Sequence, residues 1–303
     1  MRGARPQRDI EAAVERSDAL RPSERVSIAC SGGADSMALA SALHAVAQRL
    51  ALQVRLAHVN HGTRASAWQD ECIVLELAAR LDVPVDMLAF DGAKKSEAQL
   101  RDARYALLVD NARRHDCTAI AVAHHAQDQS ETVVMALLRG TGVDGLSGMP
   151  VRREVAGGIA IARPLLGVDA QALLAYCHTL MLPYAVDPTN ADTRHSRNAV
   201  REALGALRPH FPGLDRAVAR AADVLGAERE GSRRAELRRR VRERFAEEET
   251  LRDVDFAHVE AAVSAMEMGR TGTYLMKAGL ALRIERGKMH GIVTLPARSR
   301  SET

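Results

Sequence analysis

Hydrophobic and polar positions follow two alternating periods along the first two thirds of the chain. Short, nearly all-apolar runs predict strands, and the segments between them carry apolar residues every three or four positions, as amphipathic helices do. The predicted strands are 26–30, 54–59, 83–90 and 118–123, and the predicted helices are 35–48, 68–81, 97–114 and 128–138.

This order of elements predicts the fold class. Apolar strands that are separated by helices favour a parallel sheet with helices on both faces. We therefore expect an α/β domain, Rossmann-like, over residues 1–212 and a smaller α+β domain over residues 213–303. The second region opens with a long charged helical stretch, and the glycine-broken alternation of residues 273–295 predicts hairpins.

Length and composition narrow the class of protein. A chain of 303 residues that is 47% hydrophobic can form one large core and a smaller one. No apolar run approaches the ~20 residues of a membrane helix, and we expect the basic start "MRGARPQR" to be a frayed tail rather than a secretory signal. The widely spaced Cys30, Cys72, Cys117 and Cys177 argue against a zinc ribbon and favour reduced core thiols in a cytoplasmic protein.

The charge is less informative. A formal net charge of +3 does not by itself indicate a nucleic-acid partner. Only four of the 42 basic residues are lysines, and arginine suits bidentate phosphate contacts. A base-composition bias of the genome would produce the same excess, so both explanations stay open.

The turn "CSGGADS", at residues 30–36, lies between a predicted strand and the start of a helix. Ligands of open parallel sheets bind there, and a helix N-terminus favours an anion. Ser31, Gly32, Gly33 and Ser36 are therefore candidates to hold phosphate oxygens, and Asp35 fits such a site if Mg²⁺ lies between them. The alternative is a glycine-rich turn that Ser31 or Asp35 merely caps.

Ser-Gly-Gly-x-Asp-Ser resembles the pyrophosphate-binding loop of the N-type ATP pyrophosphatases (PP-loop superfamily). Further segments, in the same order along the chain, resemble the tRNA(Ile)-lysidine synthetases. They are "AHVNHGTRASAWQDE" (57–71), "EAQLRDARY" (97–105), "AHHAQDQSETVVMALLRGTGVDGLSGM" (123–149), "RPLL" (163–166) and "DPTNADTRHSRNAVR" (187–201). The resemblance is strong over residues 24–212 and weaker over residues 255–293.

The resemblance implies an ATP-dependent ligase that joins free L-lysine to C2 of the wobble cytidine of a CAU-anticodon tRNA(Ile). Cytosine O2 attacks the α-phosphorus of ATP and releases pyrophosphate, after which the lysine amine displaces AMP. ATP and Mg²⁺ are the implied cofactors. No membrane is implied, a C-terminal domain would contact tRNA, and a homodimer is left open.

Site residues follow from the matching positions. Catalytic roles are expected for Asp35, Arg104, His124 and Asp128, with Arg101 as a second candidate beside Arg104. Asp35 and Asp128 are the expected Mg²⁺ ligands, and nucleotide contacts are expected from Ser31, Gly32, Gly33, Asp35, Ser36 and His58, with His61 nearby. RNA contacts are expected from Arg139, Arg197, Asn198 and Arg201, and phosphate contacts should dominate, because nine aromatic residues cannot form an extended stacking platform.

Each assignment has a structural alternative. His124 and His125 could only pack at a strand end, and His58 could do the same. Arg101 and Arg104 could form a solvated face with Glu97 or Asp102. The basic run from Arg233 to Arg244 fits a solvated helix as well as an RNA contact.

One position departs from the family pattern. The family usually has two aspartates where this chain has Gln127 and Asp128, and glutamine cannot supply the same charge. Two other functions stay open, and Gln127 favours only the second of them. One is a PP-loop tRNA sulfur transferase, for which the chain lacks paired cysteines; the other is a non-catalytic sensor of ATP or AMP.

Overall fold

The computed structural model describes residues 4–60, 67–90, 96–141, 143–155, 157–185, 196–229, 237, 240, 256–277 and 280–294. The chain divides into two compact units, Met1–Asp223 and Val224–Thr303. This division falls within a helix, Leu214–Arg229, that begins just after the expected boundary at residue 212.

The first unit contains one mixed sheet in the order β3-β2-β1-β4-β6-β5. Five of its strands are mutually parallel, and β5 pairs antiparallel with β6 at one edge. The strands are β1 (Arg25–Ala29), β2 (Gln53–Asn60), β3 (Val85–Ala89), β4 (Ala119–Ala121), β5 (Arg152–Glu154) and β6 (Ala160–Ala162). The expected parallel α/β fold is confirmed, but the β5–β6 hairpin was not anticipated.

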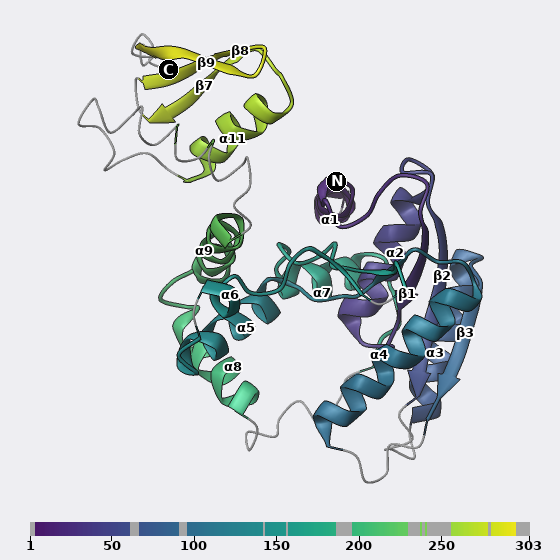
Figure 1. Ribbon diagram of the computed structural model, residues 1–303. Coiled ribbons are helices and arrows are strands. Elements are labelled where there is room, and N and C mark those ends of the chain that lie inside the picture. Colours follow the sequence, from purple (N-terminus) through teal and green to yellow (C-terminus); the bar gives the residue numbers. More distant parts are fainter. Residues whose placement is uncertain are drawn as a thin grey trace, which may run out of the picture. The chain divides into compact units, whose positions relative to one another are not determined.

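Helices cover both faces of this sheet, as Figure 1 shows. On one face α1, α2 and α7 pack together with α3, and on the other α4 crosses β1, β2 and β4. The helices are α1 (Ala4–Arg16), α2 (Ala34–Ala47), α3 (Ala67–Leu81), α4 (Glu97–Arg114), α5 (Ala126–Leu138), α6 (Val143–Leu146), α7 (Ala170–Thr179), α8 (Ser196–Leu207) and α9 (Leu214–Arg229).

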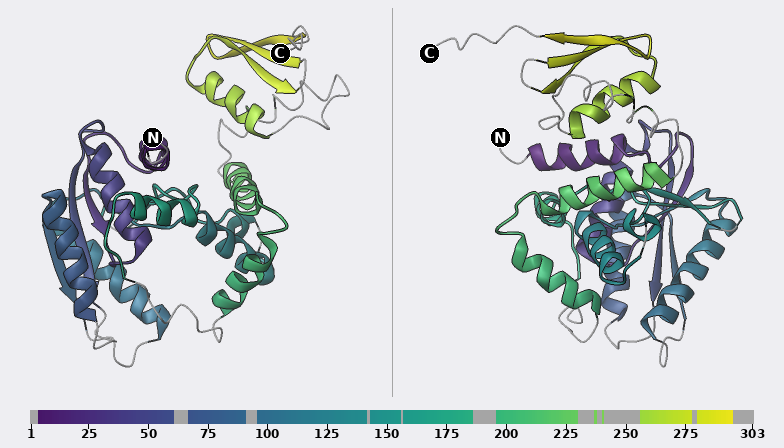
Figure 2. Two further views of the ribbon diagram at one scale, coloured as in Figure 1. Left: turned by 180° about the vertical axis from the view of Figure 1, so that it is seen from behind. Right: turned by 60° about the vertical axis from the view of Figure 1, so that its left-hand side comes forward.

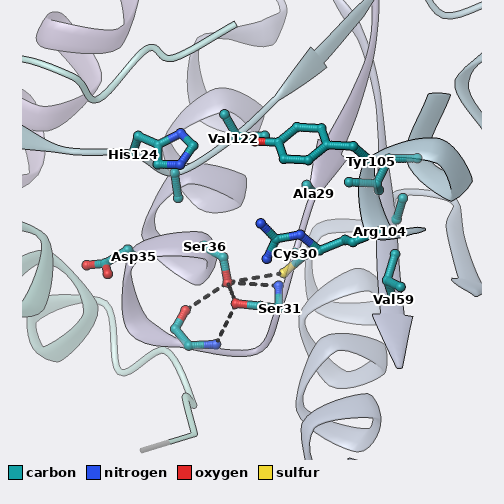
Figure 3. A pocket seen from close by; sticks show the side chains of 14 residues that line it. Ala29, Cys30, Ser31, Asp35, Ser36, Val59, Arg104, Tyr105, Val122 and His124 are labelled. Atoms are coloured by element: carbon teal, nitrogen blue, oxygen red, sulfur yellow. Dashed lines mark hydrogen bonds between the residues drawn. The ribbon is translucent and has the colours of Figure 1, made fainter. Parts of the chain in front are cut away.

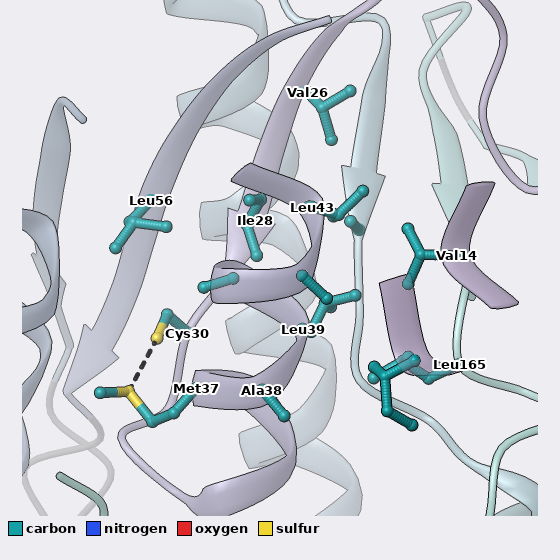
Figure 4. Close-up of a cluster of buried hydrophobic side chains, with 14 of the residues drawn as sticks. Val14, Val26, Ile28, Cys30, Met37, Ala38, Leu39, Leu43, Leu56 and Leu165 are labelled. Carbon is teal, nitrogen blue, oxygen red and sulfur yellow. Dashed lines mark hydrogen bonds between the residues drawn. The ribbon is translucent and has the colours of Figure 1, made fainter. Parts of the chain in front are cut away.

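The larger core lies between the sheet and α2. Ile28, Met37, Leu39 and Leu43 are fully buried there, and Val14 of α1 packs from outside (Figure 4). Ten of the 14 residues of α2 are buried, because α1 and α7 cover the face that turns away from the sheet. This burial anchors the helix whose N-terminus follows the glycine-rich turn.

Two expectations are wrong, one about the N-terminal residues and one about the cysteines. The basic start of the chain is not a frayed tail from residue 4 onward, because it belongs to α1, whose Ile10 and Val14 are buried against the core. Of the four free thiols, Cys72 is exposed on α3 and is no core residue, whereas the other three are buried.

The second unit has a small core of its own. Helix α11 (Phe256–Glu267) packs on an antiparallel sheet of β7 (Gly272–Lys277), β8 (Leu280–Glu285) and β9 (Lys288–Thr294), in that order (Figure 2). The predicted hairpins are thus confirmed, and Gly287, with φ +75°, forms the second turn. Most of the run from Arg233 to Arg244 lies outside the described residues.

No helix within the described part of the chain is both long and apolar enough to span a bilayer.

Candidate functional site

A cavity of about 210 Å³ opens at the carboxyl ends of β1, β2 and β4. The strand order reverses between β1 and β4, and this is where open α/β sheets bind ligands. Its walls are apolar on the strand side and polar at the turn after β1 (Figure 3). The lining residues are Ala29, Cys30, Ser31, Gly33, Asp35, Ser36, Ala57, Val59, Arg104, Tyr105, Leu108, Val122, Ala123 and His124.

The turn after β1 is held by its own hydroxyl groups. Ser36 Oγ donates to Gly33 O at 2.9 Å and accepts from Ser31 N at 3.1 Å, and the two hydroxyls lie 3.1 Å apart. The Ser31 hydroxyl is exposed toward the cavity, so it can exchange its partner for a phosphate oxygen. The turn is therefore preformed and still offers donors.

Two distant segments brace the same turn. Gly32 has φ +89°, and a Cβ placed there would lie 3.3 Å from Cβ and O of Asp70 in α3. Ala185 N donates to Gly32 O at 2.9 Å. Gly32 is thus required both by its left-handed backbone and by the close approach of α3.

Helix α2 starts at this turn with Gly33 as its N-cap and with no hydrogen bond from a capping side chain. The alternative in which Ser31 or Asp35 caps the helix is therefore wrong. The first-turn N–H groups and the helix dipole are left to favour an anion at the cavity.

Asp35 and Asp128 lie on either side of one imidazole. His125 Nε2 is 3.6 Å from Asp35 Oδ2 and 3.4 Å from Asp128 Oδ2. Burial, followed by the charge of Asp128, raises the pKa of Asp35, although His125 opposes the shift. Two carboxylates on either side of one ring nitrogen form an environment that also suits a divalent cation.

Among the described residues, no three His, Cys, Asp or Glu side chains form a metal site by themselves. Mg²⁺ is commonly held by one or two carboxylates, with waters and substrate phosphates completing its coordination. Asp35 lines the cavity beside the phosphate turn. The residues present therefore fit Mg²⁺ that arrives with a nucleotide.

Gln127, which departs from the family pattern, faces away from this pair of carboxylates. Its Nε2 donates to Asp169 Oδ2 at 2.9 Å, and its Oε1 accepts from Ala170 N at 2.9 Å. Asp169 is the N-cap of α7. Gln127 therefore links the starts of α5 and α7. Replacing the usual aspartate with glutamine at this position leaves the carboxylates of Asp35 and Asp128 unchanged.

Glu131, one turn beyond Asp128 on α5, joins that helix to α8. Its carboxylate is 2% exposed and accepts from Arg201 Nε at 2.6 Å and from Arg197 Nε at 2.8 Å. Arg197 also contacts Asp128 Oδ1 at 3.2 Å. Two of the three arginines expected to bind RNA, Arg197 and Arg201, are thus engaged in ion pairs, with 36% and 42% of their side chains exposed.

Arg104 and His124 line the opposite wall of the cavity, as expected, but the exposed Arg101 does not. Burial lowers the pKa of Arg104, and Arg101 adds to that effect. Burial, then the charge of Arg163, lowers the pKa of His124 to about 3. His124 is therefore neutral at pH 7 before any ligand binds.

The remaining expected residues lie apart from the cavity. His58 is 3% exposed and donates from Nδ1 to Cys30 O at 2.9 Å, so it fixes the end of β1 instead of lining the pocket. Arg139 is exposed at the C-cap of α5, and Asn198 lies in the first turn of α8. His61 lies outside the described residues.

Two residues at the site escaped the sequence reasoning. Tyr105 lines the cavity, and Arg163, only 4% exposed, follows β6 next to the end of β4. Both lie in segments that were singled out, "EAQLRDARY" and "RPLL", so the available signal was their position beside residues already chosen.

Comparisons with known proteins agree with this geometry. The chain is 38% identical over 206 residues to a tRNA(Ile)-lysidine synthase from Ralstonia nicotianae, which covers 66% of this chain and 44% of that protein. It is 40% identical over 220 residues to one from Streptomyces coelicolor, covering 71% and 62%. The chain thus spans about half the length of several curated relatives that it matches.

The fold also matches a solved structure. The U34-tRNA thiolase NcsA from Methanococcus maripaludis, with its [4Fe-4S] cluster, superposes with a TM-score of 0.63 at 17% identity, covering 72% of this chain and 78% of that one. The sequence model of the PP-loop domain matches residues 5–207, which include the sheet, the glycine-rich turn and both walls of the cavity. The chain therefore belongs to the PP-loop domain family of ATP-binding proteins.

Proposed function

We propose that this chain is an ATP-dependent ligase that converts the wobble cytidine of CAU-anticodon tRNA(Ile) to lysidine, with free L-lysine as the second substrate. The observation that carries the proposal is one cavity that joins a preformed phosphate turn, Ser31–Ser36, to Arg104 and the neutral His124. The names of its relatives support the choice of lysine and tRNA(Ile).

The residues divide the first step between them. The turn and the N-terminus of α2 would hold the β,γ-pyrophosphate, and Arg104 would stabilise charge on the α-phosphate. Asp35 and Asp128 would hold Mg²⁺, which neutralises phosphate charge when it is bound. Cytosine O2 then forms a bond to the α-phosphorus while the bond to the pyrophosphate oxygen breaks.

The second step transfers lysine. Its ε-amine, which must lose a proton because its pKa is near 10.4, forms a bond to C2, and the C2–O bond to AMP breaks. His124, neutral and lining the cavity, would accept or relay that proton as phosphate charge accumulates nearby. An unpaired anticodon base can enter such a pocket at modest unstacking cost.

The second unit would contact tRNA outside the anticodon. Arg270, Arg286 and Lys288 are exposed on it. On the first unit, Arg139, Arg197, Asn198 and Arg201 would add contacts with the RNA. A cytoplasmic location belongs to the same proposal. The sulfur-transferase alternative finds little support, because Cys30, Cys117 and Cys177 are buried on separate elements.

The test mixes the protein with Mg-ATP, radiolabelled lysine and a CAU-anticodon tRNA(Ile) transcript, with tRNA(Met) as the control. Lysine incorporation into the first tRNA alone, matched by AMP and pyrophosphate, is the expected result. AMP without incorporated lysine would point to another nucleophile, and bound but unconsumed ATP would point to a sensor. AMP formation that persists in Asp128→Ala would remove Asp128 from the metal site.

A further inference from the structure

Three buried polar atoms beside the cavity make no hydrogen bond of regular geometry among the described residues, although Arg104 lies close enough to Tyr105 for the two side chains to interact. The three atoms are Tyr105 Oη, His124 Nδ1 and Arg163 Nε. The hydrogen bond from Arg163 Nη1 to Pro150 O, 2.8 Å long, leaves Nε of this 4%-exposed side chain unused. Tyr105 and His124 line the cavity, and Arg163 follows β6 beside the end of β4. Buried polar groups are normally paired, so a cluster of such atoms indicates a missing partner.

The fold brings these atoms together at the ends of two neighbouring strands. Val122 N donates to Ala162 O at 2.9 Å, so His124 and Arg163 follow paired positions of β4 and β6. Tyr105 reaches the same wall from α4, and Figure 3 shows its hydroxyl end turned toward His124. The three residues come from three elements, and the turn after β1 contributes none of them.

The surroundings of the cluster are positively charged. Four arginine side chains lower the pKa of His124 by their charge: those of Arg163, Arg101, Arg197 and Arg104. The Arg101 and Arg104 guanidinium carbons lie 5.2 and 5.5 Å from the centre of the Tyr105 ring. A buried guanidinium whose partner is a neutral carbonyl is costly, and an anionic oxygen would relieve that cost.

We propose that Tyr105 and Arg163, together with His124, form a second phosphate-binding subsite, separate from the turn at Ser31–Ser36. The Tyr105 hydroxyl and Arg163 Nε would donate to one non-bridging phosphate oxygen. That oxygen belongs either to the α-phosphate of ATP or to a phosphodiester of the RNA substrate. The inference rests on the proposed function, since that function places both phosphates at this cavity.

Tyr105→Phe is the informative variant, because it removes the hydroxyl and keeps the ring that Arg101 and Arg104 contact. Tyr176→Phe is the matched control. Tyr176 Oη is likewise buried without a hydrogen bond of regular geometry among the described residues, with Ser41 as its polar neighbour, but it lies in the core on α7, away from the cavity. Thermal unfolding should show both variants folded, with neither less stable than the parent protein.

Binding is then measured with two probes, α,β-methylene-ATP and an anticodon stem-loop RNA, each by titration calorimetry. We expect Tyr105→Phe to weaken one of them about ten-fold and Tyr176→Phe to weaken neither. Weaker binding of the ATP analogue would show that the subsite holds the α-phosphate. Weaker binding of the RNA would show that it holds a phosphodiester.

Arg163→Lys, which keeps the charge and loses the guanidinium fork, should weaken the same probe. If Tyr105→Phe binds both probes like the parent protein, the subsite is wrong. If the parent protein binds the ATP analogue but incorporates no lysine, the proposed function is wrong. The binding data for Tyr105→Phe would still show whether the phosphate subsite exists.

Discussion

Two segments beside the cavity are held in different ways: the local wall is the turn after β1, and the distant wall is the segment that runs from His124, which lines the cavity, into α5. The turn after β1 is held by bonds among residues 30–36, and its donors are backbone and hydroxyl groups. The segment after β4 is held by ion pairs that reach α8, 66 to 70 residues further along the chain. A local wall can be recognised from a short stretch of sequence, whereas a wall made by distant charges cannot.

Breaking the local wall should have the largest effect. Gly32→Ala must adopt φ +89° and displace Asp70, which lies 3.3 Å from the new Cβ. We expect pyrophosphate release to fall about ten- to a hundred-fold, because the strained backbone and the contact with Asp70 together displace the donors that hold the phosphates. The left-handed backbone alone should cost about 1–2 kcal/mol of folding free energy.

Gly158→Ala separates these two effects. Gly158 also has a positive φ, +74°, but no described atom lies within 4 Å of its Cβ position, and it belongs to the turn before β6. Both variants should lose similar stability in chemical denaturation, and only Gly32→Ala should lose turnover. Equal losses of turnover would show that strain, and not the shape of the phosphate turn, is responsible.

Breaking the distant wall should have an intermediate effect. Glu131→Gln keeps the shape of the side chain and removes the charge that pairs with Arg197 and Arg201. Because both arginines are more than a third exposed, we expect a loss of only about 1–2 kcal/mol. Pyrophosphate release should fall about ten-fold, since α5 also carries Asp128.

Glu24→Gln is the control. Glu24 is a buried carboxylate that lies away from the cavity, and its ion pair with Arg152 is 2.8 Å long.

The same ion pairs of Glu131 predict a pH dependence. Burial alone would raise the pKa of Glu131, but the hydrogen bonds from Arg201 and Arg197 outweigh it and lower that pKa. The stabilisation is therefore present above the ordinary value of 4.5 and is lost as the pH falls through the folded-state pKa. The difference in melting temperature between parent and Glu131→Gln should narrow below pH 4.5; a constant difference would contradict the ion pair.

The same contrast explains how far the sequence could be interpreted. Strands β1 to β4 and helices α2 to α5 were predictable because their periodicity is strong and local. The three-residue strands of the β5–β6 hairpin carry too little pattern to be recognised. Helix α1 was missed because its basic first residues obscured the spacing of Ile10 and Val14.

At the site, the phosphate turn was predictable from its glycines and hydroxyls, and the partners of charged residues were not. Arg197 and Arg201 were chosen for RNA, yet their contacts with Glu131 depend on how α5 and α8 pack. Gln127 raised doubt because it lacks the charge of the usual aspartate, and its actual partner, the N-cap of α7, lies 42 residues away and was not predictable. Pairing between distant elements is decided by tertiary packing, which no short motif encodes.

The smallest effect is expected where the chain departs from its family. Gln127→Asp shortens the side chain, removes the donor to Asp169 and places two carboxylates near each other. The cost should be about 1 kcal/mol or less at this partly exposed position, which is a few degrees in melting temperature. Pyrophosphate release should not change, because Gln127 binds the start of α7 and not the pair Asp35 and Asp128.

Adding Asp169→Asn to Gln127→Asp should recover most of the lost stability, since the amide removes the repulsion and can donate to the new carboxylate. Asp169→Asn alone is the control, because it would also weaken the cap that accepts from Gln171 N at 2.8 Å. A rise in pyrophosphate release in Gln127→Asp would mean that position 127 faces the nucleotide after all. The distant wall would then have to rearrange when ATP binds, and its ion pairs would belong to the ligand-free state only.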